Sequence, residues 1–329
     1  YYKLNTSNLT LQDILDESTL SKTAKKAIDI FSITINSIPS QTNINDFCGT
    51  ISINTQGIKQ FKDPNLWHVL VENKLKKLNN VNIYKNTQII KILQKNNKIY
   101  AVVNQDNQKF NCDKLFLCTQ SNNILPLLEN SDSIIQNNWL SIDYMRKWCN
   151  ETFYIGFGFQ LHFDTKVDFP EKWCQSCTSE WNIIILPVSD WLIIKSKNPK
   201  IKTVWSCTIT NTNTKSKTTS KTVDESNLQE VLDESMNQLN KLISIPKPYK
   251  ITSSQNLKKI DNKWLSYNTG FTRGKYDYLP IQGKIKNLYA LGSFTDCNYS
   301  SITIFETSVR ATVQYLNNFE SKNLIGFHK

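Results

Sequence analysis

The stretch that decides the fold is "NLYALGSFTDCNYSSITIFETSVRATVQYL", residues 287–316. Residues 288–291 form a short apolar run that stops at Gly292, which predicts a buried strand. After a polar loop, apolar side chains recur every three or four positions from near residue 300, which predicts a helix. A helix N-terminus carries free N–H groups and a partial positive charge, so this unit is suited to bind a phosphate or a ring carbonyl.

The composition bounds the class of protein. The chain has 329 residues, of which 39% are hydrophobic and 20% are charged. This predicts two domains, or one large domain with an inserted lobe, and it excludes global disorder. The net charge of +11 would attract anionic partners, an anionic cofactor among them. Because the lysines are scattered, a nucleic-acid partner is not favoured, and a coding bias toward Lys, Asn and Ile explains the charge.

The eight cysteines do not indicate a small disulfide framework in so long a chain. The one CxxC, Cys174 to Cys177, has no second pair at zinc-finger spacing, and a zinc site would need Cys149 or His162 from a distance. We therefore expect no metal. No apolar run reaches 18 residues, so no transmembrane helix is expected. The first residue is Tyr1 rather than Met, which suggests that the numbering starts inside a longer precursor or after a disordered segment.

Periodicity places further elements along the chain. Helices are predicted over 10–30, 64–78 and 224–243. A β-meander is predicted over 81–119, with turns at Asn96-Asn97 and Asp106-Asn107. Further strands are predicted over 153–163, 181–187, 191–195 and 203–210.

Three stretches together resemble FAD-dependent oxidoreductases of the flavin amine oxidase and phytoene desaturase superfamily. They are "VNIYKNTQIIKILQKNNKIYAVVNQDNQKFNCDKLFLCT" (81–119), "FGFQLHFDTKVDFP" (157–170) and the strand–loop–helix at 287–316. The resemblance implies an α/β fold, with a Rossmann-like FAD-binding domain of the amine-oxidase type that is incomplete at its N-terminus and interrupted by an antiparallel α+β substrate lobe. The implied boundaries are 1–130 for the partial FAD-binding domain, 131–280 for the substrate lobe, and 281–329 for the closing strand and helix.

The resemblance also implies a set of FAD contacts. Gly292 would let the backbone approach the ribityl and pyrophosphate groups without a side chain in the way. Hydroxyl and carboxylate groups next to it would hydrogen-bond the same part of the cofactor. The N–H groups at the helix start would face flavin O2, and the alignment of this helix start with the family is open by one or two residues. One strand position would contact the adenine through its backbone. The implied cofactor-binding residues are Ile89, Gly292, Ser293, Thr295, Asp296, Thr303, Ile304 and Phe305.

The sequence departs from this family at two points. It has no G-x-G-x-x-G, the turn that cradles the pyrophosphate in the family's βαβ unit. An upstream segment could supply that unit, a second chain could supply it, or the cofactor site could have been lost. The matching substrate-lobe strand, "YIGFGFQLHF", has Gly156, Gly158 and Gln160 but lacks the lysine that amine oxidases use. This favours desaturase-like or isomerase-like chemistry over simple amine oxidation.

Other candidate residues have weaker support. His68, His162 and His328 are interpreted as structural or surface residues. Five aromatic residues could line a pocket near the flavin, and we interpret at least half of them as core residues. They are Trp264, Tyr267, Tyr276, Tyr278 and Tyr299. The catalytic residues are unknown.

The favoured function is FAD-dependent oxidation of a small or lipophilic organic substrate by hydride transfer to the flavin. The alternative is a non-catalytic relative that serves as a structural or assembly component, for example of a virus particle. A basic nucleic-acid-associated protein is a third reading, which rests on charge alone. An intracellular location is favoured, with the virion as the alternative.

Overall fold

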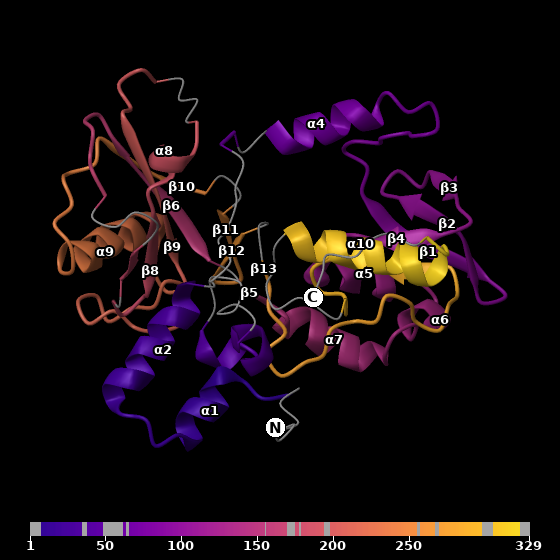
Figure 1. Cartoon of the computed structure of the whole chain (residues 1–329), viewed down its shortest axis with the longest axis horizontal. Helices are drawn as coiled ribbons and strands as arrows, with labels where there is room; N and C mark the ends of the chain where they lie inside the picture. Colours follow the sequence, from indigo (N-terminus) through magenta and orange to yellow (C-terminus); the bar gives the residue numbers. More distant parts are fainter. Residues whose placement is uncertain are drawn as a thin grey trace.

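The computed structural model describes residues 8–34, 38–48, 62–63, 66–154, 156–169, 175–177, 179–193, 198–254, 257–266, 270–297 and 305–322. Figure 1 shows an antiparallel sheet with helix α9 (Leu228–Asn240) on one side of the molecule. The β-meander lies on the other side with helices α5 (Ile124–Glu129), α7 (Ile142–Glu151) and α10 (Phe305–Phe319). Helices α1 (Leu11–Glu17) and α2 (Lys22–Thr34), from the N-terminal part of the chain, lie in the lower part of this view.

A parallel pair of strands joins the middle of the chain to its C-terminal part. Strand β4 (Leu115–Leu117) pairs with β14 (Leu288–Ala290), with Leu288 opposite Leu115. All three residues of β14 are buried, as expected for a parallel strand covered on both faces. The buried strand predicted at 288–291 is therefore confirmed over three residues.

Different side chains cover the two faces of this pair. On one face, Tyr289 packs against Tyr315 and Phe319 of α10 (Phe305–Phe319), with ring centroids 4.8 and 5.5 Å away. On the other face, Leu117 and Leu288 enter a core built with α5 (Ile124–Glu129) and α7 (Ile142–Glu151). The helix predicted after Gly292 thus packs on the strand that precedes it.

The meander consists of β1 (Ile89–Lys95), β2 (Lys98–Asn104) and β3 (Lys109–Asn111), each antiparallel to the next. Asn96, Asn97 and Asn107 have φ of 53°, 57° and 62°. Asparagine tolerates this left-handed conformation better than other non-glycine residues. Both predicted turns are therefore confirmed.

The side chain of Asn287, just ahead of β14, ties the meander to the parallel pair. Its Oδ1 accepts a hydrogen bond from the Ile99 N–H at 2.9 Å. Its Nδ2 donates to the carbonyl oxygens of Ile99 and Asp113, both at 2.7 Å. One amide thereby satisfies backbone groups in β2 and just before β4, which fixes the meander relative to the sheet.

The second sheet has the order β10–β6–β9–β8–β7 within the described residues, and all its pairs are antiparallel. Along β6 (Phe157–Phe163), every second side chain is buried, which is the pattern of a sheet with one covered face. Helix α9 (Leu228–Asn240) covers that face with Val231 and Leu239. The other strands are β7 (Gln175–Cys177), β8 (Ile183–Leu186), β9 (Thr203–Ile209) and β10 (Lys250–Ser253).

The strand predicted over 191–195 is wrong in its described part. Residues 188–191 form helix α8 (Val188–Trp191), and the Leu192 N–H donates to the Val188 carbonyl at 2.8 Å. Pro187 precedes this helix, and Asp190 lies in its first turn. A preceding proline and an early acidic residue favour a helix start, and these local signals outweigh the apolar run. Residues 194–197 lie outside the described part of the chain.

The single helix predicted over 10–30 is two helices, α1 (Leu11–Glu17) and α2 (Lys22–Thr34). Ser18 adopts an extended conformation and ends α1. The helix predicted over 64–78 is α4 (Leu66–Leu75) in the described residues. The remaining elements are η1 (Pro39–Gln41), η2 (Ser121–Asn123), α6 (Ser133–Gln136), β5 (Phe153–Tyr154), β11 (Leu257–Ile260), β12 (Lys263–Ser266) and β13 (Gly270–Phe271).

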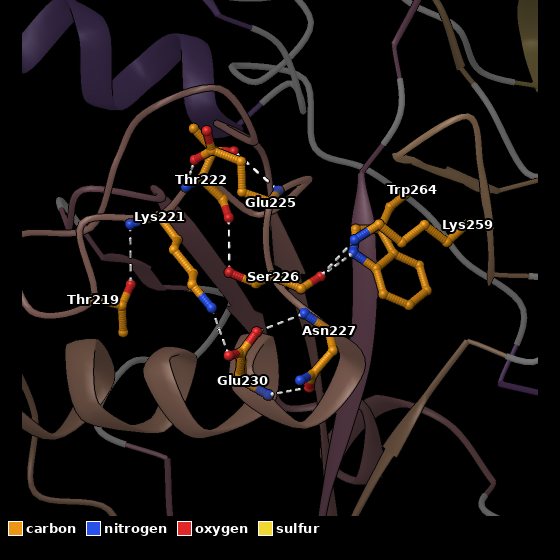
Figure 2. Close-up of polar contacts among 9 residues, drawn as sticks. All are labelled: Thr219, Lys221, Thr222, Glu225, Ser226, Asn227, Glu230, Lys259 and Trp264. Atoms are coloured by element: carbon orange, nitrogen blue, oxygen red, sulfur yellow. Dashed lines mark hydrogen bonds and ion pairs between the residues drawn. The ribbon is translucent and has the colours of Figure 1, made fainter.

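The start of α9 is fixed by the polar contacts drawn in Figure 2. Asn227 and Glu230 form a capping box, in which each side chain accepts a hydrogen bond from the other residue's backbone N–H. The carbonyl of Ser226 accepts from Lys259 Nζ and Trp264 Nε1, both at 3.1 Å. The helix predicted over 224–243 therefore begins later, after a cap, and it is joined to the β11–β12 hairpin.

This capping box yields a stability prediction. Replacing Asn227 with alanine leaves the Glu230 N–H without its side-chain acceptor, so the free energy of unfolding should fall by about 1 kcal/mol. The measurement is urea denaturation followed by tryptophan fluorescence. Asn227→Asp keeps an acceptor at the same place and is the matched control. Equal midpoints for the alanine and aspartate variants would contradict the role given to this cap.

Candidate functional site

The predicted cofactor loop begins where two parallel strands end together. The Leu291 N–H donates to the Leu117 carbonyl at 2.9 Å, so the carboxyl ends of β14 and β4 meet at one edge. In open α/β sheets, ligands bind in the crevice outside the carboxyl ends of the strands. Residues 292–297 leave the sheet at this edge.

Internal hydrogen bonds hold this loop in shape. Thr295 is fully buried, and its hydroxyl accepts from the Gly292 N–H at 3.0 Å and donates to the Ala290 carbonyl at 3.1 Å. The Thr295 N–H donates to the Gly292 carbonyl at 3.1 Å. Thr295 therefore shapes the loop, because its hydroxyl is used within it.

Gly292 is needed for a contact inside the protein. A Cβ at this position would lie 2.4 Å from Cε1 of Phe294, which is itself fully buried. Real Cβ atoms do not approach this closely, so any larger residue would have to displace the ring. The Phe294 ring therefore explains the glycine independently of any cofactor, whereas the sequence interpretation assigned it to close approach of a ligand.

The other predicted loop residues lie closer to solvent. Ser293 is half-buried and Asp296 is exposed, while the Asp296 N–H donates to the Leu279 carbonyl at 2.8 Å. The loop reaches α10 through Cys297, whose Sγ lies 4.0 Å from the Thr307 carbonyl oxygen. Ser293 and Asp296 are thus the loop side chains best placed to meet a ligand.

The predicted contacts at the helix start are only partly within the described residues. Thr303 and Ile304 lie outside them, and Phe305 is the first described residue of α10. Ile89, predicted near the adenine, is the first residue of β1, where it is half-buried against the core. The structure therefore brings four predicted residues together in one loop and places Ile89 in the separate meander sheet.

A line of aromatic rings leads away from this loop. Phe294 lies 6.3 Å from Phe271 between ring centroids, and Phe271 lies 5.5 Å from Tyr278. Trp148 packs against both phenylalanines, with centroids 6.0 and 5.8 Å away. Tyr278, suggested by the sequence as a pocket residue, is therefore part of the aromatic core behind the loop.

Tyr278 also belongs to a buried polar network. Asp46 accepts hydrogen bonds from Arg273 Nε at 3.1 Å and from the Tyr278 hydroxyl at 3.2 Å. Arg273 donates further to Asn43 Oδ1 at 2.8 Å, and its guanidinium lies 4.8 Å from the Tyr278 ring. This network fastens residues 43–46 to residues 273–278.

Sequence reasoning missed the Asp46–Arg273 pair. Its members lie 227 positions apart and carry no local motif. Burial raises the pKa of Asp46 to about 6. This effect is larger than the opposite effect of the Arg273 guanidinium, which lowers the same pKa.

Other aromatic candidates support the core interpretation. Trp264 packs edge-on against Phe157 at 5.5 Å between centroids, inside the second sheet's core region. The Tyr276 hydroxyl donates to Glu151 at 2.7 Å. Tyr267 and Tyr299 lie outside the described residues.

No ready acid, base or nucleophile stands out among the described groups. His162 Nε2 lies 2.9 Å from the Thr252 hydroxyl, and burial with the nearby Lys250 charge lowers the pKa of His162. Burial raises the pKa of Cys149 to about 12, so this thiol stays protonated. His68 lies exposed on α4, and His328 falls outside the described residues.

Metal binding and membrane spanning find no support in the described part of the chain. No group of three or more His, Cys, Asp and Glu side chains is arranged there to hold a metal ion. Within the same residues, no helix combines the length and hydropathy required to cross a bilayer.

Comparison with known proteins shows a likeness of fold. No family model and no curated protein matches the sequence. A putrescine oxidase with redesigned cofactor binding aligns over 96% of this chain and 69% of its own, with 8% identity and a TM-score of 0.59. An oxidoreductase from Methanosarcina mazei aligns over 94% and 68%, with 12% identity and a TM-score of 0.56. Cyclohexylamine oxidase from Brevibacterium oxydans aligns over 94% and 66%, with 10% identity and a TM-score of 0.55.

The chain therefore has a mixed α/β fold of the kind found in amine oxidases and related oxidoreductases. It spans about two thirds of the length of these proteins. The identities are too low to carry a substrate or a reaction across, so the predicted resemblance is confirmed for the fold alone.

The contact between Gly292 and Phe294 yields a mutational prediction. Gly292→Ala should lower the free energy of unfolding by about 1–3 kcal/mol, because the new methyl group overlaps the ring. Phe294→Leu should recover part of that loss in the double mutant, as measured by a double-mutant cycle in urea. Gly158→Ala is the matched control, because its Cβ would lie 3.7 Å from Ser254 Cβ, an ordinary contact. Additive effects of the two changes would contradict this explanation.

The buried Asp46 yields a prediction about pH. Because its pKa is raised from 3.8 to about 6 in the folded protein, its stabilising contribution is full below pH 4 and is lost as the pH rises through 6. The free energy of unfolding of the wild type, relative to Asp46→Asn, should fall by up to about 3 kcal/mol over that range. Chemical denaturation at a series of pH values measures it. A relative stability that rises with pH would mean that the Arg273 charge outweighs burial.

Proposed function

We propose that this chain is part of an FAD-dependent oxidoreductase that oxidises a small organic substrate. The observation that carries the proposal is the loop 292–297, which leaves the joined carboxyl ends of β4 and β14 and leads to α10. The fold shared with amine oxidases supports it. FAD, when bound, would supply the hydride acceptor for the reaction.

The loop residues fit a dinucleotide cofactor by the chemistry of their groups. Ser293 offers a half-buried hydroxyl and Asp296 an exposed carboxylate, which suit the hydroxyl groups of a ribityl chain. Gly292 and Thr295 would support cofactor binding indirectly. Gly292 leaves room for the Phe294 ring, and the Thr295 hydroxyl accepts a hydrogen bond that holds the loop in shape. The N–H groups at the start of α10, around Thr303, Ile304 and Phe305, would favour negative charge on the ring. Ile89 would contribute its backbone near the adenine.

The substrate side of the proposed site is the polar face of the second sheet. On β6, Gln160 is exposed and His162 half-buried, on the face opposite the one that α9 covers. Ser206 and Thr208 of β9 lie opposite Gln160 and Gly158 in the ladder. These groups can orient a polar substrate by hydrogen bonds. Because this strand carries no lysine, we favour desaturase-like or isomerase-like chemistry over amine oxidation.

The proposal requires a pyrophosphate-binding βαβ unit, because none of the nine glycines falls in the G-x-G-x-x-G spacing. An upstream segment or a second chain would supply it.

The test is direct spectroscopy of the whole natural polypeptide. It should be purified with bound flavin that absorbs near about 450 nm. Ser293→Ala and Asp296→Ala should each lower flavin occupancy, because each removes a hydrogen-bonding group from the loop. Asp106→Ala, in a meander turn, is the matched surface control and should leave occupancy unchanged. Absence of flavin after reconstitution with FAD would reject the enzyme and favour the non-catalytic alternative.

A further inference from the structure

The five-stranded sheet has a polar face opposite the one that α9 covers. Residues that stand opposite one another in an antiparallel ladder have their side chains on the same face. His162 of β6 stands opposite Lys250 of β10. Gln160 of β6 stands opposite Thr252 of β10 and Ser206 of β9. This polar face therefore brings together hydrogen-bonding side chains from three strands.

These five side chains are open to a ligand to different degrees. Gln160 and Lys250 are exposed, and the other three are half-buried. His162 Nε2 lies 2.9 Å from the Thr252 hydroxyl oxygen, so these two side chains already order each other. Amide, imidazole, hydroxyl and ammonium groups can all donate hydrogen bonds. The polar face can thus present several donors to the oxygen atoms of one ligand.

The electrostatic field on this face is positive. Burial and the Lys250 charge together lower the pKa of His162, as expected beside a cation, whereas a carboxylate partner would raise it. The described strands of this sheet contain no Asp or Glu, and Asp164 follows the end of β6. The net charge of +11 acts in the same direction at longer range. The polar face should therefore attract an anion and repel a cation.

Gly158 leaves room on the same face beside these donors. It lies two residues before Gln160 in β6 and stands opposite Thr208 of β9. Among the described residues, a Cβ at Gly158 would meet Ser254 Cβ at 3.7 Å, which is an ordinary contact. The β6 backbone is thus not crowded at this point, and the organic part of a ligand can lie against it.

The polar face is turned toward the candidate cofactor loop. In Figure 1, α9 lies on the side of the sheet away from the meander, so the opposite face is directed toward the middle of the molecule. Strand β5, which comes just before β6, pairs with β13 through Phe271. The Phe271 ring lies 6.3 Å from the ring of Phe294 in the loop 292–297. The start of β6 is therefore anchored to the aromatic core behind that loop.

We propose that the polar face binds a substrate that carries a carboxylate group, with Gln160, His162 and Lys250 as its hydrogen-bond donors. The inference rests on the proposed function and names the substrate class of that site. Among the residues of the described strands of this sheet, Lys250 supplies the one full positive charge, which matches a single carboxylate. An amine substrate, a cation near neutral pH, would meet the Lys250 charge and find no carboxylate on these strands.

Two ring compounds of opposite charge test the proposal. Cyclohexanecarboxylate and cyclohexylamine share their ring and differ in the charged group. Each is titrated into the whole natural polypeptide carrying isotope-labelled histidine, and the His162 NMR signal is assigned by its loss in His162→Gln. Cyclohexanecarboxylate should shift this signal to saturation, with an affinity about 10-fold or more above that of cyclohexylamine, because charge-assisted hydrogen bonds are formed only with the anion.

Variants at exposed positions locate the binding groups. Lys250→Ala and Gln160→Leu should each weaken cyclohexanecarboxylate binding by about 5-fold or more, because each removes a donor. Lys263→Ala is the charge-matched control, since Lys263 is exposed on the β11–β12 hairpin, which is joined to the α9 side of the sheet. It should leave the affinity unchanged. If a variant fails to fold, the comparison of the two compounds in the wild type still decides.

Three results would overturn the proposal. These are a His162 signal that neither compound shifts, cyclohexylamine binding at least as tightly as cyclohexanecarboxylate, or equal losses in Lys250→Ala and Lys263→Ala. Flavin absorbance is read on the same sample. Carboxylate binding at His162 without flavin would reject the proposed function and keep the carboxylate site. Flavin without a preference for the carboxylate would reject this inference and keep the proposed function.

Discussion

The parallel pairing of β4 with β14 is the constraint on which the rest of the structure depends. It joins segments more than 170 residues apart along the chain, with Leu115 opposite Leu288. The layers follow from it, because α10 packs on one face and the α5–α7 core on the other. The loop 292–297 starts where both strands end, so the position of the candidate site is set by this pairing and not by the loop itself.

The loop illustrates how one residue type can serve packing while it resembles a ligand motif. A glycine after a buried strand is what a dinucleotide site needs, yet at Gly292 the Phe294 ring already requires it. The Thr295 hydroxyl likewise forms its hydrogen bonds with the backbone of its own turn. The recognition of a ligand is thereby left to Ser293, Asp296 and the helix start, on a loop whose shape does not depend on the ligand.

Local signals allowed part of this structure to be predicted from the sequence. The dipeptides Asn96-Asn97 and Asp106-Asn107 indicated the two meander turns, and an apolar run that stops at Gly292 indicated β14, because these features depend on neighbours along the chain. The Asp46–Arg273 pair and the ring behind Gly292 depend on contacts between distant segments, so no spacing in the sequence reveals them. The predicted strand over 191–195 failed because Pro187 and Asp190 favour a helix start that outweighs a short apolar run.

Asn287 has one further consequence. Its side-chain amide bonds both the N–H and the C=O of Ile99, as a neighbouring strand would, so it acts as a substitute peptide group between two sheets that share no ladder. The meander and the parallel pair should therefore lose their order in a single cooperative step. A residue that resembles ordinary surface asparagine in the sequence thus adds three hydrogen bonds between two sheets whose side chains share one hydrophobic core.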